Sequence, residues 1–193
     1  YNTQYGNMRI SDDEGNILTI YGTYSADGSV RYDAMETKPV AGDTVTIYGI
    51  VGQYNGTPQI KNGWILSFVK GEPPTVPSPE ELGIPAEDGA EITIKQALAA
   101  GAMIPHNMYT ELKYKVTGEI TEVSNTQYGN MKIKDAEGNA LTLYGTWSAD
   151  GETRYDALEV KPVAGDTITV YGVLGQYNDT PQIKNGWIVE HIP

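Results

Sequence analysis

Apolar and polar residues alternate through much of this chain, a pattern typical of half-buried β-strands. In residues 114–121, "YKVTGEIT", Tyr, Val, Gly and Ile occupy one face, and Lys, Thr and Glu the other. Similar patterns predict strands at Tyr128–Ile133, Leu141–Thr146, 165–175 and 183–192. Between the third and fourth of these, "SADGETRYDALEV" predicts a turn followed by one or two helical turns. The second half of the chain is therefore predicted to contain three strands, a short helix and two further strands.

The chain contains a tandem duplication. Residues 1–70 align with residues 124–193 without a gap, and 49 of the 70 pairs are identical. The second copy is preceded by the strand-like "KYKVTGEITEVS", whereas the first copy has only Tyr1 before "NTQYGNM". We therefore expect the first copy to have four of the five predicted strands.

The predicted order of elements is that of a five-stranded Greek-key barrel. On the residues "YGNM", "LTLYG", "KPVAGDTITVYG" and "YNDTPQIKNGWI", with the preceding helix "TIKQALAAG", the sequence resembles the OB-fold. It is most similar to tandem OB-like modules of secreted or surface proteins of gut clostridia. The resemblance implies an all-β protein with short helices, made of two OB-like barrels in tandem. The first barrel would lack its N-terminal strand within this chain.

Composition and spacing divide the chain into three parts. Residues 1–70 are expected to form the incomplete barrel, 71–91 a semi-rigid linker rich in Pro, Glu and Gly, and 92–193 a helix with the complete barrel. Thr93 and Gln96 form a candidate capping box for a helix through Ala100. Gly101 is expected to close this helix, which would pack over the bottom of the second barrel.

An open barrel would leave strand edges unpaired and its core uncovered, which favours aggregation unless something fills the gap. Three explanations are open. The chain is a fragment of a longer polypeptide that supplies the strand, another chain donates the strand, or the segment around 110–123 is exchanged between protomers.

Charge and composition narrow the possible functions. The net charge is −12, and residues 71–123 carry half of it, with 3 basic and 9 acidic groups. The repeats are only mildly acidic, so the charge makes nucleic acid a less favoured partner without excluding it. The absence of cysteine excludes disulfides and thiolate chemistry. No segment has the roughly 18 apolar residues needed to span a bilayer.

The sequence offers little for catalysis. His106 and His191 are the only histidines, and neither recurs in the other repeat. "SDDEGN" and "KDAEGN" resemble calcium loops only faintly, because they lack the twelve-residue spacing and the terminal Glu. We interpret them as hairpin turns that use Gly and Asn at positive φ. We therefore expect no enzymatic activity, no cofactor and no metal.

Aromatic and amide residues gather where an OB barrel usually binds ligands, on its second and third strands and the flanking loops. Tyrosine rings with Asn and Gln side chains suit a neutral, hydroxyl-rich ligand such as a glycan. The alternative is that Tyr54 and Tyr177 plug the barrel ends while the amides cap turns. The candidate ligand-binding residues are Tyr5, Tyr24, Gln53, Tyr54, Asn55, Gln59, Gln127, Tyr128, Trp147, Gln176, Tyr177, Asn178 and Gln182.

Three functions follow from these observations. The first is a non-catalytic binding or spacer module of a larger extracellular bacterial protein, with a glycan or cell-surface polymer as partner; the extracellular location rests on the resemblance alone. The second is a single-strand nucleic-acid module, which requires Tyr128, Trp147 and Arg154 to converge on a positive face, although Arg154 could instead pair with Asp156. The third is a structural module that self-associates through the open first barrel.

Overall fold

The structure is a computed structural model that describes residues 4–193, so residues 1–3 of the predicted first domain lie outside the described part. The chain divides into two compact units, unit 1 (Tyr1–Pro74) and unit 2 (Thr75–Pro193). Both are built mainly of β-strands, and unit 2 also contains two short α-helices. The prediction of a mostly β protein with short helices is therefore confirmed.

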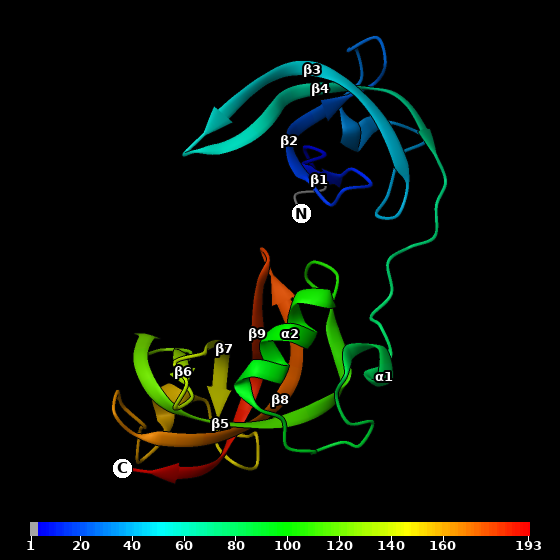
Figure 1. Cartoon of the computed structure of the whole chain (residues 1–193). Coiled ribbons are helices and arrows are strands. Elements are labelled where there is room, and N and C mark those ends of the chain that lie inside the picture. The colour runs from blue at the N-terminus through cyan, green and yellow to red at the C-terminus, as the bar shows by residue number, and fades with distance from the viewer. Residues whose placement is uncertain (1–3) are drawn as a thin grey trace. The chain divides into compact units, whose positions relative to one another are not determined.

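Unit 1 is an open four-stranded sheet. Its strands are β1 (Met8–Ser11), β2 (Ile17–Tyr24), β3 (Thr44–Tyr54) and β4 (Thr57–Val69), with the 3₁₀ helix η1 (Tyr32–Ala34) after β2. The strand order is β1-β2-β4-β3, with β2 and β4 parallel and the other pairs antiparallel. Figure 1 shows β3 and β4 as a long curved hairpin. Within residues 4–74, the outer edges of β1 and β3 pair with no further strand.

Unit 2 contains the same four strands and one more. They are β6 (Asn130–Lys134), β7 (Ala140–Trp147), β8 (Thr167–Tyr177) and β9 (Thr180–Ile192), with the 3₁₀ helix η2 (Tyr155–Ala157) after β7. The additional strand, β5 (Tyr109–Asn125), pairs with β6 on one side and with β8 on the other. The five strands thus close into a ring in the order β5-β6-β7-β9-β8. The predicted difference of one strand between the two repeats is confirmed.

The core of unit 2 explains why its strands alternate in sequence. Tyr114, Val116 and Ile120 of β5 point inward and are almost completely buried, whereas the residues between them are more exposed or have no side chain. Gly118 lies where strands and helix approach closely, because an added Cβ would come within 2.8 Å of the Lys134 carbonyl oxygen. Inward side chains from the other strands complete the core, among them Met131, Leu141, Leu143, Ile168, Val170, Leu174 and Ile183.

Helix α2 (Ile94–Met103) covers part of this ring. It contacts β5, β7, β8 and β9, and it begins with the predicted capping box of Thr93 and Gln96. The predicted end at Gly101 is wrong, because the helix continues to Met103. Gly101 instead lies against the β8–β9 hairpin, where an added Cβ would come within 2.7 Å of the Pro181 side chain. This glycine allows close packing rather than terminating the helix.

Much of the predicted 71–91 linker belongs to unit 2. Helix α1 (Pro79–Leu82) follows a Ser78 capping box, and Leu82 and Ile84 are buried in the core of unit 2. The Tyr114 hydroxyl donates a hydrogen bond of 3.0 Å to the Pro85 carbonyl oxygen. These apolar and hydrogen-bonding contacts hold the segment along β5. The structure therefore differs from the expected extended linker over residues 75–91.

Candidate functional site

The segment "GQYNDTPQ", which joins the predicted strands 165–175 and 183–192 and was expected to form one of the flanking loops of the ligand face, is not an open loop. Strand β8 continues to Tyr177 and β9 begins at Thr180, so the connection is a two-residue turn. Asn178 and Asp179 have φ angles of 48° and 58°, as a type I′ hairpin turn requires at both central positions. The amide side chains flanking the turn are consequently in paired strands.

Both predicted ligand-binding glutamines of this hairpin are buried and bonded within unit 2. Gln182 Nε2 donates a hydrogen bond of 2.7 Å to the Tyr109 hydroxyl oxygen, and Gln176 Nε2 donates to the Ile104 carbonyl oxygen. These bonds attach the β8–β9 hairpin to the segment joining α2 and β5. Because such contacts are made between residues about seventy positions apart, the local sequence gave no sign of them. Gln176 and Gln182 therefore support the fold.

The hairpin tip carries the next two predicted residues. Tyr177 is half exposed and its ring centroid lies 5.5 Å from that of His106. The backbone N–H of Asn178 donates a hydrogen bond of 3.2 Å to His106 Nδ1. Nearby, Lys184 Nζ lies 4.5 Å from the centre of the Tyr109 ring. His106, Tyr109 and Lys184 also contribute to this surface, although their positions in the sequence did not predict them as binding residues.

In unit 1 the equivalent residues lack these partners because no equivalent of residues 104–109 is present among the described residues. Gln53 and Tyr54 are exposed, and Gln59 is only partly buried. Asn55 has a φ of 48° and forms the same kind of tight turn. The same hairpin sequence is thus anchored in unit 2 and uncovered in unit 1.

A second group of predicted residues converges on one surface of unit 2. The Arg154 guanidinium carbon lies 5.1 Å from the centre of the Tyr128 ring, and the backbones of Trp147 and Arg154 form an antiparallel bridge. Gln127 is exposed in the preceding turn, where its N–H donates to the Asn125 side chain. Of the three residues that the nucleic-acid alternative requires, Tyr128 and Arg154 therefore meet here, and the backbone of Trp147 lies beside that of Arg154.

The charge that this alternative requires is neutralised. Arg154 Nε and Nη2 donate hydrogen bonds of 2.8 and 2.7 Å to the two Asp156 carboxylate oxygens. The hydrogen bond from Arg154 lowers the pKa of Asp156, so the pair is ionised and its net charge is zero. The surface offers aromatic rings beside an internally paired cation.

Unit 1 repeats this cluster almost unchanged. The Arg31 guanidinium carbon lies 5.2 Å from the centre of the Tyr5 ring, and Arg31 donates the same two hydrogen bonds to Asp33. The backbone of Tyr24, at the position of Trp147, forms the antiparallel bridge with Arg31. A cluster retained in both repeats that satisfies its own charges is consistent with a structural role.

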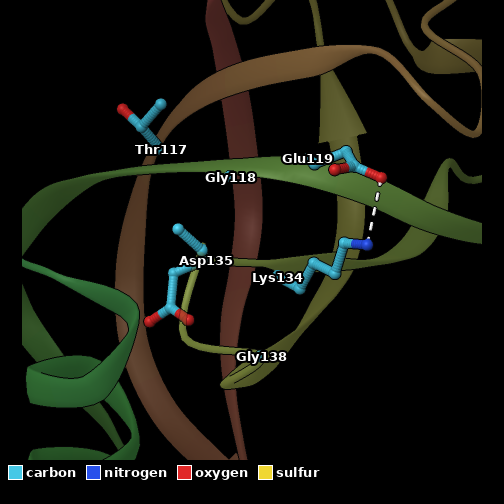
Figure 2. Close-up of a pocket in the computed structure, with 7 residues that line it drawn as sticks. Thr117, Gly118, Glu119, Lys134, Asp135 and Gly138 are labelled. Carbon is cyan, nitrogen blue, oxygen red and sulfur yellow. Dashed lines mark ion pairs between the residues drawn. The ribbon is translucent and has the colours of Figure 1, made fainter.

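A shallow depression lies beside β5 at the start of the β6–β7 turn (Figure 2). Lys134 Nζ forms an ion pair of 3.2 Å with Glu119 Oε1, which Figure 2 marks. The Asp135 carboxylate accepts hydrogen bonds from Asn139 and from the Glu137 N–H, and these bonds lower its pKa. Asp135 therefore stabilises the hairpin turn, as Asp12 does in unit 1. Over residues 4–193, no group of three or more His, Asp or Glu could hold a metal ion.

A clear difference in packing between the two repeats lies on β3 of unit 1. Val51 is 71% exposed and Ile50 is 82% exposed, although both belong to a β-strand. Their equivalents in unit 2 are Leu174, which is completely buried, and Val173, which is partly buried. The two units thus have closely similar sequences but differ in whether β5 and α2 cover the sheet.

The aromatic residues at the other part of β3 follow the same trend. In unit 2, Trp187 lies edge-on to Tyr171 at 5.6 Å, and Lys113 Nζ of β5 lies 3.9 Å from the centre of the Trp187 ring. In unit 1, Tyr48 and Trp64 also contact each other, at 5.9 Å, but both are exposed.

Comparisons with known proteins add no information about function. Neither a protein-family model nor a curated protein matches the sequence. No helix in the described residues is long and apolar enough to cross a membrane.

Proposed function

We propose that the chain is a non-catalytic assembly module in which the open sheet of unit 1 binds a β-strand. The observation that carries this proposal is the exposure of Ile50 and Val51 on β3 beside unpaired strand edges. Exposed, apolar strand edges promote pairing with another chain, and folded proteins normally cover or charge them. Strand addition to such an edge is a common mode of peptide recognition.

Unit 2 supports the proposal because it is nearly the same sheet with one more strand. We propose that both repeats are OB-like and that unit 1 becomes a complete OB-like unit when a strand is added. The order β5-β6-β7-β9-β8, with β7 and β9 parallel, is consistent with such a Greek-key arrangement. The incoming strand would pair with β1 and β3, as β5 pairs with β6 and β8.

This function takes precedence over the two ligand-binding alternatives because, in unit 2, several residues proposed for them already have partners. Gln176 and Gln182 are buried in hydrogen bonds that anchor the hairpin of unit 2. Arg154 is paired with Asp156. An extracellular setting in a larger bacterial protein stays a prediction from the resemblance.

The proposal can be tested with a synthetic peptide of residues 109–125, which contains β5. Titrated into the full chain and followed by fluorescence anisotropy of a label on the peptide, it is expected to bind saturably with one site per chain. The matched control carries Gly118→Val, because the close approach at Gly118 leaves no room for a larger side chain. Equal binding of the two peptides would contradict strand addition to unit 1.

A further inference from the structure

Resting on the proposed strand addition, we infer that the occupant of the open sheet is a helix followed by a strand, with the pattern of residues 92–125. In unit 2 this segment contributes both α2 and β5. Its helix has a Thr-x-x-Gln capping box and one apolar face, and its strand alternates apolar and polar residues around a glycine. The partner is thus a polypeptide that carries such a segment.

The helix belongs to the occupant because β5 alone does not account for the buried sheet of unit 2. Helix α2 contacts β7, β8 and β9 as well as β5, and its residues Ile94, Ala97 and Ala100 are almost completely buried. Gly101 of the helix lies against Pro181. The equivalent of Pro181 in unit 1 is Pro58, which is exposed. A strand that paired with β1 and β3 without a helix would leave this end of the sheet open.

Two glycines at matching positions provide an independent indication. In unit 2 a Cβ added to Gly175 would come within 2.2 Å of the Met108 carbonyl oxygen and within 2.4 Å of the Tyr109 ring. In unit 1 a Cβ added to Gly52 would meet nothing within 4 Å. Gly52 therefore has open space at the position where the start of β5 would enter. Within unit 1 no neighbouring atom requires glycine at this position, whereas a segment that enters as β5 does in unit 2 would require it.

Polar groups of unit 1 also match those that hold the segment in unit 2. The hydroxyl groups of Thr117 on β5 and Thr169 on β8 lie 2.9 Å apart in a hydrogen bond, and Thr46 is the equivalent of Thr169. Glu122 of β5 forms an ion pair of 3.7 Å with Lys132, whose equivalent is the basic Arg9. The cross-strand chemistry of β5 is therefore retained on the open sheet.

Further along the sheet, Gln176 and Gln182 bond the segment in unit 2, and their equivalents Gln53 and Gln59 are identical. Gln53 is exposed in unit 1. We infer that it donates to a carbonyl of the incoming segment, as Gln176 donates to Ile104. Both ends of the segment thus have matching groups on unit 1.

Residues 92–125 of a second copy fit this role poorly. In each copy, residues 92–125 already fill unit 2, where Ile94, Tyr114 and Ile120 are at most 1% exposed. Exchange between copies would uncover one core in order to cover another and would gain no apolar burial overall. A segment that is not already engaged would gain the full burial.

The test compares three synthetic peptides in titrations of the full chain: residues 91–125, residues 109–125 and residues 91–108. The longest is expected to bind at least tenfold more tightly than the strand peptide, because its helix buries additional apolar surface. The helix peptide alone is expected not to bind, since an isolated helix of this length is marginal in water. The chain variant Gly52→Leu is expected to weaken binding of the longest peptide at least tenfold. Its unfolding without peptide should match that of the original chain.

Each of the other possible outcomes would overturn a part of the proposal. Equal affinities for residues 91–125 and 109–125 would overturn the helix–strand inference and leave strand addition standing, whereas no binding by either would overturn both. Undiminished binding to the Gly52→Leu chain would place the peptide elsewhere, for example by exchange into unit 2. If the chain self-associates without peptide and Gly52→Leu abolishes this, residues 92–125 of a second copy are the occupant and the argument against them is wrong.

Discussion

Truncation of one residue in each repeat provides an internally matched test of the two sheets. Leu174 on β8 is completely buried and lies opposite Ile183, whereas its equivalent Val51 on β3 is 71% exposed. Leu174→Ala removes buried carbon atoms and leaves a cavity, which costs about 2–5 kcal/mol in comparable cores. Val51→Ala removes two carbons that are mostly exposed already. At ~0.8 kcal/mol per buried CH₂ this change costs at most about 0.5 kcal/mol.

Amide hydrogen exchange of the full chain, read separately for peptides from each unit, distinguishes the effect of Leu174→Ala from that of Val51→Ala. The exchange is measured as a function of urea and at low protein concentration. Unit 2 of Leu174→Ala is expected to lose about 2–5 kcal/mol of unfolding free energy. In a thermal experiment this corresponds to a fall of about 8–20 °C at ~4 °C per kcal/mol. In the Val51→Ala chain, the unfolding free energy of unit 1 should be almost unchanged. A loss above about 1 kcal/mol in unit 1 would exceed the expected range for an exposed position and would show that β3 is covered in solution.

Two further predictions concern bonds that hold unit 2 together. The Tyr155 hydroxyl donates a hydrogen bond of 2.6 Å to the buried Pro162 carbonyl oxygen. Tyr155→Phe should therefore lower the free energy of unfolding, measured with urea, by about 1–3 kcal/mol. The equivalent change Tyr32→Phe should lower it less, because Tyr32 is only half buried. Unfolding that is unaffected by Tyr155→Phe would refute this. Hydrogen bonds from the Val163 N–H and from His191 lower the pKa of Asp166 below 3.8. The stability that this carboxylate provides is therefore present above the usual Asp pKa and is lost as the pH falls through the lowered value. Asp166→Asn should destabilise unit 2 at about pH 6 and have little effect at about pH 2, and an equal effect at both would contradict the assignment.

The alternation of residue types predicted the strands of unit 2 because that unit buries mainly one face of each strand. The capping box at Thr93 was equally readable, since its two hydrogen bonds join residues three positions apart. Glycine was less informative, because the same residue ends helices and permits close packing. Gly101 serves the second purpose, and only its contact with Pro181 reveals this.

Long-range contacts account for the other differences. Leu82 and Ile84 are isolated apolar residues in a Pro-rich segment, and their burial depends on a core built from residues far along the chain. Gln176 and Gln182 are of the residue type expected in a glycan site. Their hydrogen-bond partners Ile104 and Tyr109 lie outside the hairpin, so the hairpin sequence alone could not reveal these bonds. The incomplete first sheet, in contrast, could be predicted from the repeat alone, since it follows from counting strands.

The most direct test of strand addition is amide hydrogen exchange of the full chain with and without the peptide of residues 91–125. Strand addition predicts slower exchange along β1 and β3, with unit 2 unchanged, and loss of this protection in the Gly52→Leu chain. Exchange in β1 and β3 that is unaffected by saturating peptide would contradict the proposed function. Protection confined to unit 2 would show that the peptide replaces the chain's own segment instead.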